Sequence, residues 1–220
     1  MLLILGAGGF AREVYSHCRD YGYHTMAFYD DVSDTDSIIV LDDKVKVYKS
    51  FDEVLLHKAA FEKLFTQEHP GNSYEFVIGV GDPGLKKALV TKALGAGLKP
   101  AETIIHPSVN IGRGKIGVGG IITPGCSLTV DFEIGDYVIL NLNSTVGHDA
   151  YIGDYCTVNP GCSISGNVVI RSECLIGSCA FIREKKKIAY RVTVGAQACV
   201  TKDIDRCHTV WGGVPAKLIR

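Results

Sequence analysis

The chain has 220 residues, enough for one or two domains, and its net charge of −1 gives no electrostatic reason to expect nucleic acid as a partner. The first residues lack the basic segment and the long apolar run of a signal peptide or a membrane span. We therefore expect a cytoplasmic protein without membrane insertion. Its eight cysteines are then expected to be reduced thiols. None of them forms a Cys-x-x-Cys pair, so the cysteines give little support for a metal site.

The first half of the chain alternates apolar strands with helical segments. Strands are expected over 2–5, 24–29 and 76–80, and helices over 12–21, 51–65 and 85–94, with a turn over 70–73. This alternation predicts a small α/β, Rossmann-like domain over residues 1–102.

A glycine-rich turn follows the first predicted strand. Gly6, Gly8 and Gly9 allow backbone N–H groups to approach a phosphate at the start of the next helix. Asp30 and Asp31 come about twenty residues later, where an acidic side chain can meet a ribose or a base. A tight turn without a ligand is the alternative, and a domain of this length is too short for a full NAD site.

The second half repeats every six residues. Steps of six meet an aliphatic residue each time, at Ile116, Ile122, Leu128, Ile134, Leu140, Val146, Ile152, Val158, Ile164, Ile170, Ile176, Ile182, Ile188, Val194 and Val200. The next position is often Gly or Asn, which suggests a turn there. The fourth position after the aliphatic residue is small, and four of the cysteines occupy it. This period predicts a triangular prism of stacked coils, a parallel β-helix over residues 103–220, with caps below 116 and above 200.

His148 is the candidate catalytic residue of the repeat. It follows the inward-facing Val146 by two positions, a register in which neighbouring repeats hold no fixed residue type. An outward-facing imidazole there can act as a general base near neutral pH. A solvated surface histidine is the alternative. Between 116 and 205 there is no second histidine, so a three-histidine zinc site is not expected.

Motifs along the whole chain resemble the left-handed β-helix nucleotide-sugar N-acetyltransferases, which act on amino sugars of the bacillosamine, perosamine and viosamine type. The segments that carry this resemblance are Gly6-Ala7-Gly8-Gly9, Gly79-Val80-Gly81-Asp82, His106-Pro107-Ser108, Gly147-His148-Asp149, Pro160-Gly161, Ser165-Gly166-Asn167, Val200-Thr201-Lys202-Asp203 and Gly213-Val214-Pro215-Ala216-Lys217.

The resemblance implies a homotrimer that binds acetyl-CoA between two prisms and the nucleotide-sugar acceptor on the small α/β domain. His148 would be the general base, Asp149 would orient it, and the Gly166 N–H would stabilise the oxyanion. Acetyl-CoA would lie along Val194, Gly195, Ala196, Pro215 and Lys217. The acceptor would contact Gly6, Gly8, Gly9, Asp30, Asp31, Gly81 and Asp82.

Two positions depart from the family pattern. Many relatives carry a second histidine nine residues after the first, and here that place is Thr157. The segment 183–187 is unusually basic, and its three lysines are candidate contacts for the CoA phosphates. A solvated charged corner is the alternative.

The resemblance predicts acetyl transfer from acetyl-CoA to the amino group of a nucleotide-linked 4-amino-4,6-dideoxy sugar. O-acetylation of a sugar of the sialic-acid type remains open, because related proteins share the two-domain plan. A non-catalytic nucleotide-sugar binding protein is the third reading, and the intact Gly147-His148-Asp149 segment argues against it.

Overall fold

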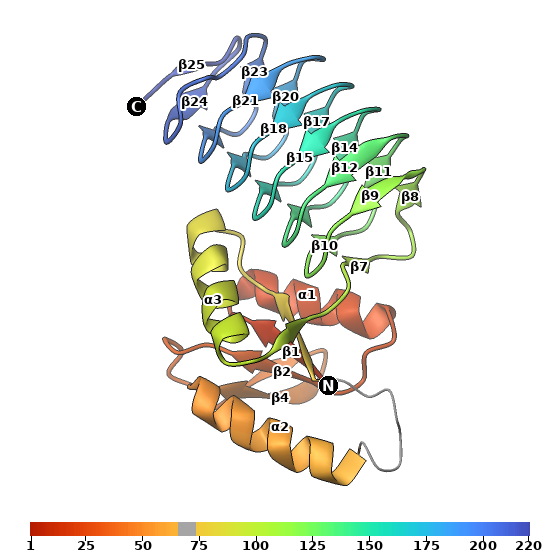
Figure 1. The fold of residues 1–220 in the computed structure, drawn as a ribbon, viewed down its shortest axis with the longest axis vertical. Helices are drawn as coiled ribbons and strands as arrows, with labels where there is room; N and C mark the ends of the chain where they lie inside the picture. Colours follow the sequence, from red (N-terminus) through yellow and green to blue (C-terminus); the bar gives the residue numbers. More distant parts are fainter. Residues whose placement is uncertain (66–73) are drawn as a thin grey trace. The chain divides into compact units, whose positions relative to one another are not determined.

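The computed structural model describes residues 1–65 and 74–220. They form two compact units, one made of Met1–Val80 and Lys87–Ala101 and the other of Gly81–Lys86 and Glu102–Arg220 (Figure 1). The turn predicted over 70–73 lies outside the described residues. Among the helices of the described residues, none combines the length and the apolar character needed to cross a bilayer.

The first unit is built on a six-stranded sheet with the order β3-β4-β2-β1-β5-β6. The strands are β1 (Leu2–Leu5), β2 (Met26–Tyr29), β3 (Ser37–Val40), β4 (Asp43–Tyr48), β5 (Glu75–Ile78) and β6 (Lys99–Pro100), and the helices are α1 (Gly9–Asp20), α2 (Phe51–Phe65) and α3 (Pro83–Gly95). The start of α3, as far as Lys86, belongs to the second unit.

The strands and helices predicted for the first half are present, with shifted ends. All of β1 is buried, as expected for a central strand that pairs in parallel with β2 and β5. Helix α1 buries Ala11, Val14, Tyr15 and Cys18, the spacing of one helical face. The β3–β4 hairpin was not predicted. Its Leu41-Asp42 turn has positive φ at both residues without the usual Asn or Gly signal.

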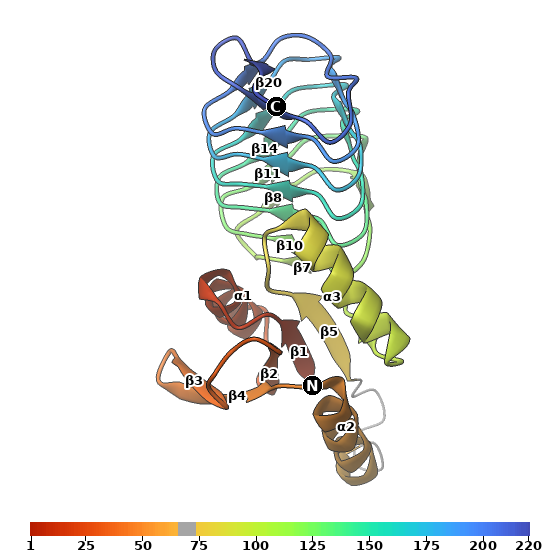
Figure 2. The ribbon, with the colours of Figure 1, turned by 90° about the vertical axis from the view of Figure 1, so that its left-hand side faces the viewer.

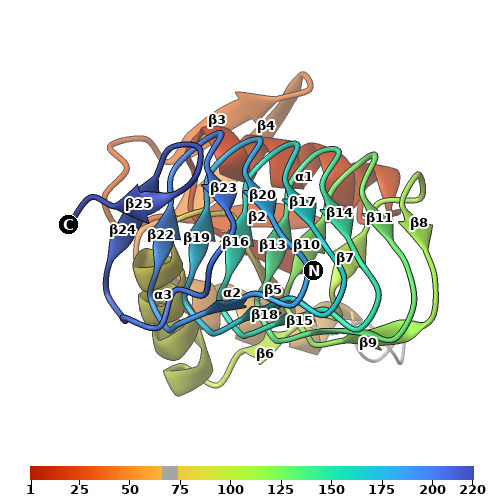
Figure 3. The ribbon, with the colours of Figure 1, turned by 90° about the horizontal axis from the view of Figure 1, so that it is seen from above.

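The second unit is a prism with three sheets, one along each side (Figure 3). We call these three sheets D, E and F. Sheet D contains β7 (Ile104–Ile105), β10 (Ile121–Ile122), β13 (Ile139–Leu140), β16 (Thr157–Val158), β19 (Leu175–Ile176), β22 (Thr193–Val194), β24 (Val210–Gly212) and β25 (Lys217–Leu218). Sheet E contains β8 (Asn110–Ile111), β11 (Ser127–Leu128), β14 (Thr145–Val146), β17 (Ser163–Ile164), β20 (Phe181–Ile182) and β23 (Cys199–Val200). Sheet F contains β9 (Gly114–Ile116), β12 (Phe132–Ile134), β15 (Tyr151–Ile152), β18 (Val169–Ile170) and β21 (Lys187–Ile188). The predicted left-handed parallel β-helix is confirmed.

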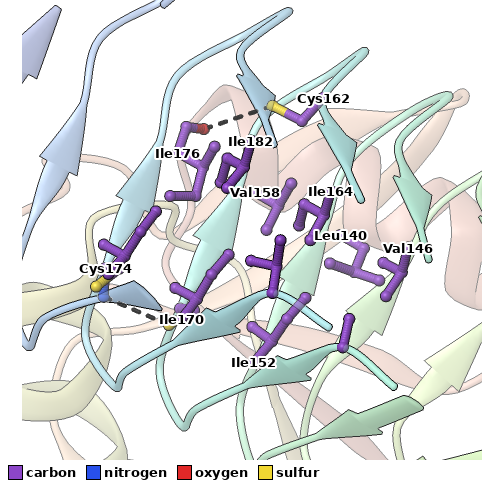
Figure 4. Packing of buried hydrophobic residues seen from close by; sticks show 14 of the residues in the cluster. Leu140, Val146, Ile152, Val158, Cys162, Ile164, Ile170, Cys174, Ile176 and Ile182 are labelled. Atoms are coloured by element: carbon purple, nitrogen blue, oxygen red, sulfur yellow. Dashed lines mark hydrogen bonds between the residues drawn. The ribbon is translucent and has the colours of Figure 1, made fainter. Parts of the chain in front are cut away.

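The coils of the prism stack on one another (Figure 2), and this brings residues eighteen apart in the sequence side by side. The parallel register pairs Leu140 with Val158, Val158 with Ile176 and Val146 with Ile164. These aliphatic side chains are no more than 1% exposed and fill the inside of the prism (Figure 4). The predicted small residues complete the core, including four buried cysteines, and all eight cysteines of the chain are free thiols.

The turn position predicted from the repeat was wrong by two residues. Positive φ falls three positions after the aliphatic residue, as at Tyr137, Asn143 and Asp149, and not on the glycine that follows it directly. Those glycines answer a steric need, because a Cβ at Gly147 would stand 2.5 Å from the amide nitrogen of Gly166 in the next coil.

The coils also extend beyond the predicted caps. The stacking begins with β7, whose Ile105 pairs with Ile122, and it continues to Trp211, which pairs with Val194. The exact six-residue step fails in these end coils because they are one or two residues shorter than the regular coil. Lys185 occupies a regular corner with positive φ.

Candidate active site

His148 and Asp149 lie at the corner between β14 and β15, where the chain turns from sheet E to sheet F. Adjacent residues of an extended strand point to opposite faces. Here Asp149 adopts φ 56°, so the chain turns and the two side chains meet. Asp149 Oδ2 lies 2.7 Å from His148 Nδ1, and more than half of each side chain is exposed.

Gly166 and Asn167 of the next coil contact His148 and fix the position of its ring. Gly166 stands directly beside the ring, because a Cβ there would lie 2.5 Å from His148 Nε2. Asn167 donates its backbone N–H to the His148 carbonyl oxygen at 2.8 Å, and its side-chain Nδ2 lies 3.4 Å from His148 Nδ1. The ring therefore has one defined resting place, set by the absence of a side chain at Gly166.

Two polar groups at this corner make no hydrogen bond among the described residues. Within the described residues, His148 Nε2 has no hydrogen-bond partner, and neither has the Gly166 N–H, although the adjacent Ser165 and Asn167 amides donate to carbonyl oxygens. A carboxylate only accepts, so Nδ1–H donates to Asp149, and in the neutral ring Nε2 then carries the lone pair. The corner thus presents a proton acceptor next to a backbone donor, the two groups that acyl transfer uses.

The residues predicted to bind acetyl-CoA lie at a different corner of the prism. Val194 to Ala196 lead from β22 to β23, between sheets D and E. The Val194 side chain is buried, so only its backbone can meet a ligand, whereas Ala196 is exposed. Pro215 and Lys217 are exposed on the C-terminal segment, which is held to the prism by the bond from the Ala216 N–H to the Cys199 carbonyl oxygen, 2.8 Å. Within one chain, these residues and His148 are not brought together.

The predicted acceptor residues divide between the two units. In the first unit, Gly6 takes φ 109°, which allows the sharp turn after β1, while Gly8 and Gly9 are exposed at the start of α1. A Cβ at Gly8 would meet nothing within 4 Å. The Gly6 and Ala7 N–H groups of this turn donate to Tyr29 and Asp30, so the exposed Gly8 and Gly9 are the part that a phosphate could approach.

Asp30 has a structural role that the sequence did not reveal. Its Oδ2 accepts the Ala7 N–H at 2.9 Å, and its Oδ1 accepts the N–H groups of Val32 and Ser33. It therefore holds the glycine-rich turn in place and is occupied by the backbone. Asp31 is exposed and forms an ion pair with Lys92 at 3.0 Å, and the hydrogen bond from that lysine lowers the pKa of the Asp31 carboxyl.

Gly81 and Asp82 belong to the second unit. Asp82 caps α3, because its Oδ1 accepts the Leu85 N–H at 2.8 Å, with Pro83 at the first helical position. A cavity of about 380 Å³ lies beside them and is lined also by Glu173 and Arg191. Glu173 is buried and accepts the Arg191 Nε–H at 2.7 Å.

Lys86 and Thr157 form a buried polar cluster that sequence reasoning did not foresee. Both are at most 1% exposed, and Lys86 Nζ lies 2.8 Å from Thr157 Oγ1. The available signal was the position of Lys86 in its helix, three and four residues before the buried Leu89 and Val90, where the apolar face calls for a hydrophobic residue.

Comparison with known families defines the class of the protein. Residues 1–93 match the PglD N-terminal domain, and residues 149–184 match the bacterial transferase hexapeptide family with its six repeats. The predicted resemblance is confirmed: the chain combines a match to the PglD N-terminal domain with a match to the bacterial transferase hexapeptide repeats. The comparison with curated proteins found no match.

Several solved structures are similar over the whole chain. WeeI from Acinetobacter baumannii AYE is 25% identical, with a TM-score of 0.83, and the match covers 100% of this chain and 99% of WeeI. The acetyltransferase domain of PglB from Neisseria gonorrhoeae FA1090 is 25% identical, with a TM-score of 0.82 and coverage of 99% and 98%. PerB from Caulobacter crescentus, solved in complex with CoA and GDP-perosamine, is 27% identical, with a TM-score of 0.79 and coverage of 100% and 97%.

Proposed function

We propose that this protein transfers the acetyl group of acetyl-CoA to the amino group of a nucleotide-linked 4-amino-4,6-dideoxy sugar. The observation that carries the proposal is the His148–Asp149 pair, with Nε2 open toward solvent, on a hexapeptide-repeat β-helix. The full-length similarity to PerB, whose structure contains CoA and GDP-perosamine, supports acetyl-CoA as the donor and a nucleotide sugar as the acceptor.

His148 would act as the general base. Asp149 holds the Nδ1–H tautomer, so Nε2 can take a proton from the sugar nitrogen as that nitrogen attacks the thioester carbonyl carbon. The C–N bond forms, the C–S bond breaks, and the proton passes from Nε2 to the departing CoA sulfur. The Gly166 N–H would stabilise the negative charge on the carbonyl oxygen in between. No metal enters this scheme.

The proposal includes a homotrimer, which is supported by the family resemblance and by the placement of the site residues. His148 lies between β14 and β15 and Ala196 between β22 and β23, which are different corners of one prism. Figure 3 labels these strands. Acetyl-CoA in a groove between two prisms can contact His148 of one protomer and Ala196 of another. Light scattering in solution tests this, and a monomeric active enzyme would contradict it.

The nucleotide would bind at the open turn of the first unit. The exposed Gly8 and Gly9 amides at the start of α1 are suited to the pyrophosphate. Asp31 is a better candidate than Asp30 for a contact to the ribose or the base, because three backbone amides already occupy the Asp30 carboxylate. We place the reaction in the cytoplasm.

One observation keeps O-acetylation as a second candidate. A hydroxyl must lose its proton during attack, whereas an amine need only be neutral, so tight coupling of the base to an acid favours a hydroxyl acceptor. The 2.7 Å contact between His148 Nδ1 and Asp149 Oδ2 provides such coupling. The two functions differ only in the acceptor atom and are separated by the choice of substrates.

The test is thiol release from acetyl-CoA with UDP-, dTDP- and GDP-linked 4-amino sugars, with sialic acid as the hydroxyl acceptor. Turnover on an amino sugar that falls about 10²- to 10⁴-fold in His148→Ala supports the proposal. Turnover on sialic acid alone would assign the protein to O-acetylation. Acetyl-CoA binding without turnover on any acceptor would favour a non-catalytic binding protein.

A further inference from the structure

Lys86 is completely buried, although an ammonium group is costly to remove from water. Its Nζ atom lies 3.1 Å from the carbonyl oxygen of Tyr137, 3.3 Å from that of Tyr155 and 2.9 Å from that of Cys156. It also lies 2.8 Å from Thr157 Oγ1. These acceptors belong to two stacked coils at the corner between sheets F and D, so one side chain ties the start of α3 to the β-helix.

The Thr157 hydroxyl links Lys86 to the backbone at Gly81, just before α3. An ammonium group only donates, so Thr157 Oγ1 accepts from Lys86. Its own proton then goes to the Gly81 carbonyl oxygen, 2.6 Å away. A hydroxyl has one proton to donate, so the direction of both bonds is determined. Lys86, Thr157 and Gly81 form an ordered chain, which we call the Lys86 clamp.

A purely structural reading of the clamp is weak. Within the described residues, no carboxylate is within hydrogen-bond distance of Lys86 Nζ. Burial lowers the pKa of Lys86 to about 7, and the negative charge of Asp82 opposes this effect without cancelling it. A hydrophobic residue at this place on the buried face of α3 would avoid the loss of hydration. The buried amino group is therefore kept at a cost in stability, which calls for another role.

The backbone held at Gly81 continues into residues that line a cavity. Gly81 is followed by Asp82, which caps α3 through the Leu85 N–H and lines the cavity of about 380 Å³. The Asp82 carbonyl oxygen accepts the Lys86 N–H at 2.9 Å, which closes the segment into one rigid turn. Any movement of the Gly81 carbonyl group would therefore turn the Asp82 carboxylate relative to the cavity.

We propose that Lys86 and Thr157 are positioning residues, which hold the Gly81 backbone against the β-helix and thereby aim the Asp82 carboxylate at the sugar of the acceptor. The inference rests on the proposed function and deepens it. Thr157 occupies the place where the resemblance led us to expect a second imidazole. Its hydroxyl serves here as a relay in the clamp and does not touch the reacting atoms.

The clamp is tested with Thr157→Val, which keeps the shape and removes the hydroxyl. Thr123→Val is the matched control, since Thr123 is equally buried and its hydroxyl donates to the Leu140 carbonyl oxygen at 3.1 Å. Steady-state kinetics with the nucleotide-linked amino sugar should show the acceptor KM raised about tenfold in Thr157→Val, as expected for a broken buried hydrogen bond. The acetyl-CoA KM should stay within about twofold.

Rescue and a second variant make the test specific. Thr157→Ser restores the hydroxyl and should return the acceptor KM toward that of the wild type, while Lys86→Met should raise it at least as much as Thr157→Val. Equal changes in both KM values, no change in either, or the same effect in Thr123→Val would overturn the proposal.

Hydrogen exchange separates the clamp from the activity. The Leu85 and Lys86 amides should exchange faster in Thr157→Val and Lys86→Met than in the wild type, and at the wild-type rate in Thr123→Val. Unchanged exchange in both clamp variants would refute the clamp itself. Faster exchange in those variants, together with a wild type that acetylates no acceptor, would refute the proposed function and with it the role assigned to Asp82.

Discussion

Substitution of Gly166 by alanine should disable the site without unfolding the protein. A Cβ there would stand 2.5 Å from His148 Nε2, 2.7 Å from Cε1 and 2.9 Å from Cδ2, whereas ordinary contact begins at 3.4 Å. The imidazole must therefore retreat by about 0.9 Å, since the backbone of the neighbouring coil holds Gly166 in place. A displacement of about 1 Å from reacting geometry lowers rates about 100-fold.

Stability should change little, because 59% of the His148 side chain is exposed and the ring can swing into solvent. We expect Tm within a degree or two of the wild type. The control is Gly95→Ala, where a Cβ would meet nothing within 4 Å. The assay is kcat/KM for thiol release from acetyl-CoA with the acceptor identified by the substrate panel.

A double-mutant cycle decides whether Gly166 acts through the ring. If it does, adding Gly166→Ala to His148→Ala should lower the residual rate no further. A full additional loss of about 100-fold in the His148→Ala background would refute this reasoning. It would show instead that the alanine methyl group blocks the thioester or disturbs the Gly166 N–H.

Three further outcomes are expected. Asp149→Asn should lower kcat/KM about 10- to 100-fold with Tm unchanged, because Asn tolerates the φ of 56° but binds His148 Nδ1–H less strongly; a loss of Tm of many degrees would contradict this. Burial lowers the pKa of Lys86 from 10.5 to about 7, so the unfolded chain binds the extra proton between these values and the free energy of unfolding should rise with pH across that window. The slope should reach about 1.4 kcal/mol per pH unit. If urea titrations show the same rise in the free energy of unfolding with pH in Lys86→Met, Lys86 is not the group responsible. Ile164→Ala should lower the free energy of unfolding by about 2–5 kcal/mol, whereas the neighbouring, outward-facing Ser163→Ala should change it by less than about 0.5 kcal/mol; equal losses by urea unfolding would contradict the assigned register.

The sequence was sufficient for the architecture because the prism is a local, periodic structure. Each coil needs an inward aliphatic residue every six positions. Residues such as Val146, Ile152 and Val158 therefore predict the fold from the sequence, and no distant contact has to be known. His148 stood out for the same reason, as a histidine in a register that the repeat does not explain. Even there, the turn was assigned to the glycine after the aliphatic residue, since sequence alone does not distinguish a glycine needed for φ from one needed for space.

Only the tertiary structure decided how single groups are used. The αL conformation of Asp149 turns its carboxylate toward His148, whereas adjacent residues of an extended strand would point to opposite faces. Asp30 was expected at a ligand, but its oxygens are taken by backbone amides from two separate segments. Lys86 was unremarkable in a helix, yet it meets four oxygens from residues 51 to 71 positions away. Such partners come together only through folding, so no local pattern records them.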